Sequence, residues 1–161
     1  MQPLHDLYQR YATDVFRFTL SLCGNRADAE DITSDTFVRL WTAPGEIRLV
    51  TVKAYLFTIA RRLYIDRCRA DSRLSELDPA LLSEARSAED CAAARSDMAH
   101  VRRAINALPE ADRTALLMRA GGVSYEEIAR ALGTSVGAVK VRVHRSRKRL
   151  IEKRPAQESL P

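Results

Sequence analysis

The chain has 161 residues, 46% of them hydrophobic and 29% charged, and a formal net charge of +5. A disordered chain would contain fewer apolar side chains, and no apolar run approaches the roughly 20 residues that a membrane-spanning helix needs. With only 6 Gly and 6 Pro, and with abundant Ala, Leu and Arg, the composition predicts an all-α fold rather than a turn-rich sheet structure.

The first predicted helix covers residues 4–22. Its apolar side chains recur at steps of three and four residues, which is the pattern of one buried helix face. They are Leu4, Leu7, Tyr8, Tyr11, Val15, Phe18 and Leu22. Because acidic and polar groups stand where a signal peptide needs an apolar stretch, we expect the protein to remain in the cytoplasm, with no membrane insertion.

A second predicted helix follows Asn25 and ends before Pro44 and Gly45. Its expected buried side carries Ile32, Phe37, Leu40 and Trp41. Four carboxylates lie early in this helix, where they complement the partial positive charge of a helix N-terminus. They are Asp28, Glu30, Asp31 and Asp35. On this pattern alone, a solvated acidic surface and a docking surface are equally acceptable interpretations.

The third predicted helix runs from about Val52 to Arg69, with Val52, Leu56, Ile59, Ala60 and Leu63 facing inward. Its other side is aromatic and basic. Aromatic rings can stack on unpaired bases while guanidinium groups hold the strand, so this side is a candidate surface for single-stranded nucleic acid. It consists of Tyr55, Arg61, Arg62, Tyr64 and Arg67.

Residues 71–97 lose clear periodicity and gather Ser, Ala and acids, with 7 acidic residues against 3 basic ones. We predict that this segment is a flexible linker. Residues 98–161 contain 13 basic residues against 6 acidic ones, which favours a polyanionic partner for this end of the chain.

The last third has the pattern of a helix-turn-helix. A helix containing Leu116 stops at the Gly121-Gly122 pair, and Ser124 with Glu127 has the spacing of a capping box. The helix that they start ends at Gly133, a residue suited to a left-handed turn. A strongly basic helix follows at once, as expected of the helix that enters the major groove of DNA.

Helical geometry divides this basic helix into two faces. Val136, Val139, Val143 and Leu150 should pack inward, whereas Val141, His144, Arg145 and Lys148 should point outward, flanked by Lys140 and Arg142. Most of the basic side chains must contact phosphate, because charge alone reads no sequence. Arg145 or Lys140 could also donate to guanine, and Val141 could meet a thymine methyl group.

Three segments resemble extracytoplasmic-function (ECF) sigma factors of the sigma-70 family. DAEDITSDTFVRLW, followed by AYLFTIARRLYIDRCR, is similar to region 2 of that family, and INALPEADRTALLMRAGGVSYEEIARALGTSVGAVKVRVHRSRKRL is similar to region 4. The resemblance implies a region 2 domain at residues 1–70, a linker at 71–97, a region 4 domain at 98–155 and a tail at 156–161.

The resemblance also implies a transcription initiation factor, not an enzyme, with no cofactor and no metal. Its partners would be core RNA polymerase, through the clamp helices of the largest subunit and the flap, promoter DNA and an anti-sigma factor. The clamp helices would meet Asp28, Glu30, Asp31 and Asp35. The loop at 42–51 and the third helix would capture a flipped base of the minus-10 element, with Lys53, Tyr55, Arg61, Arg62, Tyr64 and Arg67 as contacts. The helix-turn-helix would read the minus-35 duplex through Ser135, Lys140, Val141, Arg142, His144, Arg145 and Lys148.

Two other functions remain open on the residues alone. A helix-turn-helix regulator that binds DNA without polymerase would explain residues 98–154 equally well. An enzyme fits less well, because His5, His100 and His144 are scattered and no phosphate-binding glycine loop is present. Three widely spaced cysteines, Cys23, Cys68 and Cys91, suit neither a zinc site nor a redox pair, although a Cys23–Cys68 thiol switch remains an alternative.

Overall fold

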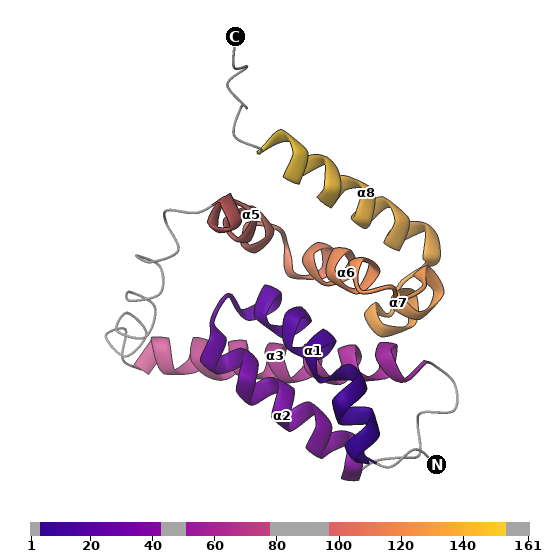
Figure 1. The fold of residues 1–161 in the computed structure, drawn as a ribbon. Coiled ribbons are helices and arrows are strands. Elements are labelled where there is room, and N and C mark those ends of the chain that lie inside the picture. Colours follow the sequence, from indigo (N-terminus) through magenta and orange to yellow (C-terminus); the bar gives the residue numbers. More distant parts are fainter. Residues whose placement is uncertain (1–3, 43–50, 78–96, 154–161) are drawn as a thin grey trace.

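In the computed structural model, which describes residues 4–42, 51–77 and 97–153, every regular element is a helix. The all-α prediction is therefore confirmed. Figure 1 shows the order of the helices along the chain. They are α1 (Leu4–Cys23), α2 (Arg26–Thr42), α3 (Val52–Leu77), α5 (Asp97–Asn106), α6 (Glu110–Ala120), α7 (Tyr125–Leu132) and α8 (Val136–Glu152). None of these helices is both long and apolar enough to cross a bilayer.

Helices α1, α2 and α3 form the N-terminal group. Phe18 of α1 stacks on Phe57 of α3 with ring centroids 4.4 Å apart. Between α1 and α2 the contact is polar as well as apolar, because the buried hydroxyl groups of Thr19 and Thr33 lie 3.1 Å apart. Each hydroxyl also lies within hydrogen-bond distance of a carbonyl of its own helix, so both have partners whichever of the two donates to the other.

Two side chains expected in this core are exposed instead. Trp41 is 70% exposed, because the buried stripe of α2 ends at Leu40 and the next residue is turned by about 100°. Tyr8 is 49% exposed and covers only the edge of Phe37, at a centroid distance of 4.9 Å. The prediction that both belong to the buried side is wrong.

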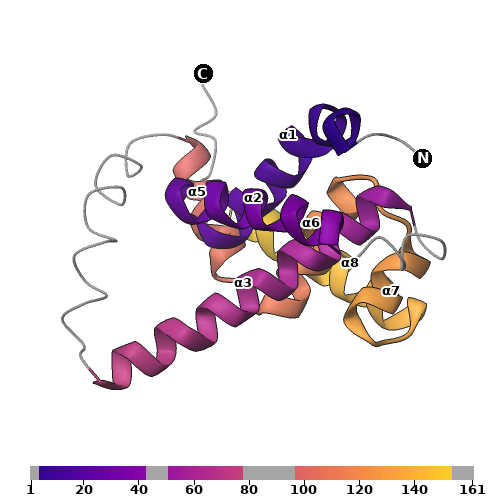
Figure 2. The same ribbon diagram turned by 90° about the horizontal axis from the view of Figure 1, so that it is seen from below.

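Helix α3 is longer than predicted and ends at Leu77 instead of Arg69. Residues 70–77 contain no Gly or Pro and include several good helix formers. The sequence therefore has no helix-breaking residue between Arg69 and Pro79. The extended end of α3 is solvent-exposed and projects beyond the other helices (Figure 2).

Helices α5 to α8 form the C-terminal group and contain the predicted helix-turn-helix. The Ser124 side chain accepts from the backbone N–H of Glu127 at 3.2 Å, and Gly133 has φ +65°, in the left-handed region. Ser135 then caps α8 by accepting from the N–H of Ala138 at 3.1 Å. The predicted capping box and the glycine turn are both confirmed.

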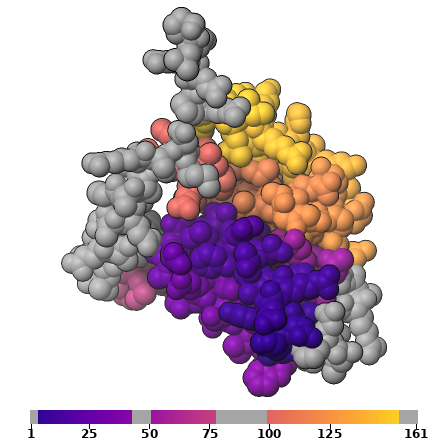
Figure 3. All heavy atoms as spheres, in the orientation of Figure 1, coloured from indigo at the N-terminus to yellow at the C-terminus, as the bar shows by residue number. Residues whose placement is uncertain are grey.

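The two helical groups share one continuous hydrophobic core, from Val15 in α1 to Val143 in α8. At the contact between them, Phe57 of α3 lies against Gly121 at the end of α6. In the view of Figure 3, the indigo-to-magenta helices lie directly against the orange-to-yellow ones. The sequence predicts two domains joined by a linker, and no local pattern in it indicates this contact.

Candidate nucleic-acid interface

Helix α8, here called the recognition helix, has the two faces that the sequence predicts. Val139 and Val143 are fully buried, and Val136 and Leu150 pack partly buried against the core. Ser146 is also fully buried, and its hydroxyl donates to the carbonyl of Arg142 at 2.7 Å. These contacts fix the rotation of the helix about its axis.

The opposite face of the recognition helix is open to solvent. Lys140, His144 and Lys148 are exposed, and Val141 has 60% of its surface exposed. An exposed Val flanked by cationic groups suits a surface that meets both phosphate oxygens and the edges of base pairs. Of the predicted contacts, Ser135 is exposed at the start of the same helix but has its side-chain oxygen occupied by the cap.

Two other predicted DNA contacts are held by an internal carboxylate. Asp112 of α6 is 1% exposed and accepts from Arg142 Nη1 at 2.8 Å and from Arg145 Nη2 at 2.9 and 3.0 Å. Burial alone raises the pKa of the Asp112 carboxyl, but the hydrogen bonds and charges of Arg145 and Arg142 outweigh it, so the pKa is lowered. We call this group of Asp112, Arg142 and Arg145 the α6–α8 clamp.

The sequence does not single out Asp112 as a partner of the recognition helix. Asp112 lies in the first turn of α6, where acidic residues are common because they complement the helix dipole. Its partners lie 30 and 33 residues later in the chain, and no local pattern connects them.

The aromatic and basic residues predicted to line one side of α3 differ in their partners and in their exposure. Lys53 pairs with Asp14 at 3.4 Å, and Arg62 is exposed. Arg61 is only 18% exposed, because its guanidinium binds both oxygens of Glu110 in α6. Tyr64 accepts from Arg113 of α6 at 3.0 Å. Only part of the predicted strand-binding side is therefore free.

Glu110 has an electrostatic environment that keeps it ionised. Burial raises the pKa of its carboxyl, but the hydrogen bonds from Arg61 and Thr114 outweigh that effect and lower the pKa overall. The ionised carboxylate in turn compensates the partly buried Arg61 guanidinium.

Arg67 faces the acidic side of α2. Its guanidinium lies 3.4 Å from Asp28, 3.7 Å from Asp31 and 3.7 Å from Asp35. The side chains of the three acids are 49%, 68% and 57% exposed, respectively. These three acids surround one cation, and together with Glu30 we call them the acidic surface.

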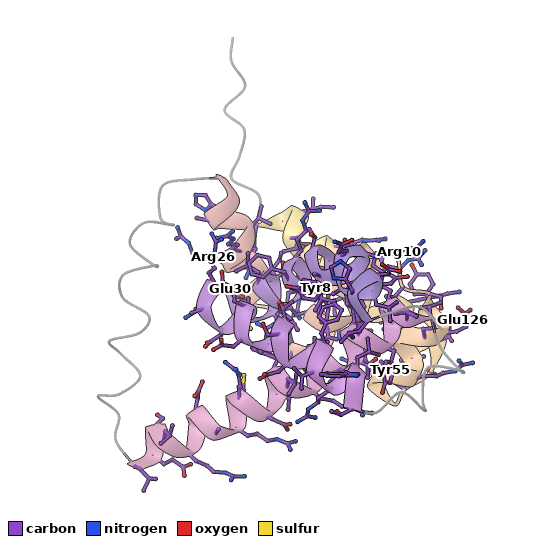
Figure 4. The ribbon with its side chains drawn as sticks, turned by 60° about the horizontal axis from the view of Figure 1, so that its bottom comes forward. Tyr8, Arg10, Arg26, Glu30, Tyr55 and Glu126 are labelled. Atoms are coloured by element: carbon purple, nitrogen blue, oxygen red, sulfur yellow. The ribbon has the colours of Figure 1, made fainter. Side chains whose placement is uncertain are left out.

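Glu30, the fourth acid, pairs instead with Arg26 at 3.1 Å. In Figure 4 these two side chains lie at one end of the N-terminal helices, whereas Tyr55 lies toward the other end, near Glu126 of α7. The acidic surface and the start of α3 are therefore separate places on the molecule. Of the predicted base-capturing loop at 42–51, residues 43–50 lie outside the described residues.

The two cysteines that the structure describes, Cys23 and Cys68, form no disulfide. Cys23 is half-buried, and burial, followed by the nearby Asp28, raises the pKa of its thiol to about 12. The thiolate that would start an exchange reaction is disfavoured at neutral pH. Cys68 is exposed, and Cys91 lies outside the described residues. Over the part of the chain that the structure describes, no group of three His, Cys, Asp or Glu side chains could hold a metal ion.

Comparison with known proteins gives matches over both helical groups. Residues 7–74 match the family model described as Sigma-70 region 2, and residues 99–150 match Sigma-70, region 4. Together the two matches include the acidic surface, most of α3 and the helix-turn-helix.

Two curated relatives are similar over most of the chain. The ECF RNA polymerase sigma factor SigE of Mycolicibacterium smegmatis is 31% identical over 156 residues, covering 93% of this chain and 61% of the relative. The ECF RNA polymerase sigma factor EcfG of Rhodopseudomonas palustris is 32% identical, covering 83% of this chain and 75% of the relative. This chain thus spans about three fifths and three quarters of their lengths.

A solved structure is similar over almost the whole chain. The sigma factor RpoE in complex with the anti-sigma factor NepR from Bartonella quintana has a TM-score of 0.77 and 27% sequence identity. The match covers 95% of this chain and 99% of that one, so the likeness includes the arrangement of the two helical groups.

Proposed function

The chain belongs to the ECF sigma factors of the sigma-70 family, with a region 2 and a region 4, and we propose that it directs core RNA polymerase to its promoters. The observation that carries this proposal is the presence in one chain of a free, basic recognition helix and a region 2 with a separate acidic surface. A regulator that binds DNA alone would need the first and would have no use for the second. No catalytic group is required.

The recognition helix is proposed to read the minus-35 element as duplex. Lys140, Val141, His144 and Lys148 lie on its exposed face and would meet the major groove. Because Asp112 holds Arg142 and Arg145, their role would be to position the helix and to contact phosphate with their remaining donors.

Region 2 is proposed to perform strand capture and docking. The side of α3 that carries Lys53, Tyr55, Arg61, Arg62 and Tyr64 would hold the opened minus-10 strand. Strand opening costs a few kcal/mol of stacking energy, which a protein surface can offset by binding the extruded base. The acidic surface of α2 would dock on the clamp helices of polymerase, and region 4 on the flap.

An anti-sigma factor is proposed as a regulatory partner. The support is the similarity to RpoE, which was solved in complex with NepR. Binding of the purified chain to the products of neighbouring genes would test this. Full activity on expression, with no such complex, would contradict it.

Run-off transcription with core polymerase on genomic fragments tests the main proposal. The expected result is promoter-specific transcripts that appear only when this chain and core polymerase are both present. A chain that retained specific operator binding but had no affinity for core polymerase would be a plain helix-turn-helix regulator. The same experiment identifies the promoter sequence needed for the predictions below.

A further inference from the structure

Lys140 of the recognition helix lies against an aromatic ring of the preceding helix. Its ammonium group is 5.6 Å from the centroid of the Tyr125 ring, and Tyr125 is the first residue of α7. A cation within about 6 Å of a ring centroid is attracted to the ring electrostatically. Among the described residues, the ion pairs of the recognition helix are those of Arg142 and Arg145, and Lys140 takes part in none. The ring is therefore the electrostatic partner of Lys140.

The Tyr125 ring is itself held in place. It packs partly buried against the hydrophobic core, and the cap at Ser124 fixes the backbone just before it. The guanidinium of Arg119, in α6, lies 4.3 Å from the centroid of the same ring. Arg119 Nη1 also donates to the carbonyl of Val123 at 3.3 Å. The ring is thus a fixed platform where α6, α7 and α8 meet (Figure 1).

Two like charges share this platform. Arg119 and Lys140 repel one another, and within the described part of the chain neither is paired with a carboxylate. The ring attracts both cations and so offsets their repulsion. Without the ring, the Lys140 ammonium would move away from Arg119 and take up other positions.

The position of the ammonium decides what a lysine reads on DNA. Lysine carries a point charge on a flexible four-carbon chain, so an unrestrained lysine distributes its donors over phosphates, which carry no sequence information. Guanine presents its O6 and N7 acceptors at one place in the major groove. A lysine restrained to one position can meet that place repeatedly. Lys148, exposed on the same helix, has no ring contact among the described residues.

We infer that Tyr125 is a positioning residue for minus-35 reading, whose ring holds Lys140 where its ammonium meets a base edge. This inference rests on the proposed function, which places the recognition helix in the major groove. The cations of α8 then have separate supports. Asp112 of α6 holds Arg142 and Arg145, and Tyr125 of α7 holds Lys140.

Four substitutions separate the ring from the charge. Tyr125→Phe keeps the aromatic face, whereas Tyr125→Leu removes it and retains an apolar side chain for the core. Lys140→Met removes the charge and keeps the length of the side chain. Lys148→Met is the matched control, because it removes an exposed cation of the same helix that has no ring contact.

The experiment measures the Kd of the assembled holoenzyme for its promoter duplex and for duplexes with single minus-35 substitutions. The preference at a base pair is the ratio of the two Kd values. We expect Lys140→Met to lower the preference at one base pair, and Tyr125→Leu to lower it at the same base pair by about 2- to 5-fold. Tyr125→Phe should keep the wild-type preference. Lys148→Met should weaken binding by a similar factor for every sequence.

The double variant tests whether Tyr125 acts through Lys140. In the Lys140→Met background, Tyr125→Leu should have no further effect on the preference, because the contact that it removes is already absent. If the two effects added instead, or if Tyr125→Leu alone left the preference unchanged, the inference would be overturned. An equal loss in Tyr125→Phe and Tyr125→Leu would also overturn it, since the hydroxyl group would then be responsible.

Failure of the proposed function gives a different result. A wild-type holoenzyme with no preference at any minus-35 position would contradict the proposed function, and the inference with it. If that preference exists but Lys140→Met changes it at no base pair, the proposed function stands and the inference alone is overturned.

A measurement on the full chain without polymerase covers the case in which Tyr125→Leu does not fold. Protons over the face of an aromatic ring resonate upfield because of the ring current. The Cε protons of Lys140 should therefore resonate upfield of those of Lys148, in the wild type and in Tyr125→Phe. Equal shifts for the two lysines would show that the ring does not hold Lys140 in solution, which would overturn the inference.

Discussion

Asp112 and Arg145 form an ion pair that joins α6 to the recognition helix, with two N···O distances of 2.9 and 3.0 Å. The carboxylate is 1% exposed, whereas the Arg145 side chain is 47% exposed. Arg142 binds the same carboxylate at 2.8 Å. The acid is thus buried and compensated, while its cations remain at the surface that would face DNA.

Replacing Asp112 with Asn should destabilise the protein, because the neutral amide cannot compensate two cations from inside the core. We expect a loss of about 1–3 kcal/mol in the free energy of unfolding at pH 7, below the full cost of a buried pair since both arginines are partly solvated. Urea unfolding followed by circular dichroism measures it. Asp66→Asn, at an exposed position of α3, should change stability by less than about 0.5 kcal/mol.

The effect of Asp112→Asn should depend on pH. The pKa of Asp112 in the folded protein is lowered below its ordinary value of 3.8. Its stabilising contribution is therefore complete above pH 3.8 and is lost as the pH falls through the folded pKa. The difference between wild type and Asp112→Asn should shrink in acid below pH 3.8. A difference that stayed constant over that range would show that the clamp does not depend on the ionised carboxylate.

Arg145 and Val141 should differ in what they contribute to promoter binding. Arg145→Ala removes part of the clamp and a phosphate donor, so binding should weaken by a similar factor for every minus-35 sequence. Val141→Ala removes an apolar contact at an exposed position and should change the preference at one base pair, by about 1–3 kcal/mol. Holoenzyme binding to promoters with single minus-35 substitutions measures both. If Arg145→Ala changed the affinity only for promoters substituted at one base pair, the sequence-based hypothesis that Arg145 reads guanine would be supported instead.

Local patterns predict the helix-turn-helix correctly because its caps and its turn depend on residues close in sequence. The cap at Ser124 and the left-handed turn at Gly133 are set within four residues of the helix that they bound. The inward position of Val139 and Val143 follows from helical spacing alone. These features can be predicted without knowing which residues of other helices pack against them.

The missed features depend on pairs far apart in the chain. Arg61 meets Glu110 across 49 residues, and Thr51 meets Glu127 across 76. Periodicity marked Arg61 as a free cation on a polar face, and only the packing of the two groups shows that it is paired. Trp41 is exposed for a different reason, because it is turned away from the buried stripe of α2, which ends at Leu40.

Gly133 should be the more sensitive of two glycines in the helix-turn-helix. At φ +65° an L side chain is strained, so Gly133→Ala should destabilise the protein by about 1 kcal/mol, although a Cβ there meets nothing within 4 Å. Gly137 lies inside α8, so Gly137→Ala should instead stabilise by up to about 1 kcal/mol through helix propensity. Thermal unfolding of the two variants should shift in opposite directions. Equal shifts would mean that the turn tolerates a side chain.

Substitutions in and beside the acidic surface test whether it docks on core polymerase, because they should change the Kd in opposite directions. If Asp31 and Asp35 dock on a basic surface of core polymerase, Asp31→Asn with Asp35→Asn should raise the Kd by about 5- to 30-fold, and the effect should diminish at high salt. Arg67→Ala removes the cation that partly neutralises these acids, so it should tighten core binding. A solvated surface with no docking role would leave both variants at the wild-type Kd.

Arg67 is also among the residues predicted to hold the minus-10 strand, and the two roles can be separated in one titration series. Docking is measured as the Kd of Arg67→Ala for core polymerase without DNA. Strand binding is measured as the affinity of the assembled holoenzyme for the single-stranded minus-10 element of its own promoter. Because Arg67 lies 3.4 to 3.7 Å from three carboxylates, its charge is already compensated where it stands. We therefore expect tighter docking and little change in strand affinity, whereas an equal loss in both would mean that Arg67 leaves the acids and binds the strand.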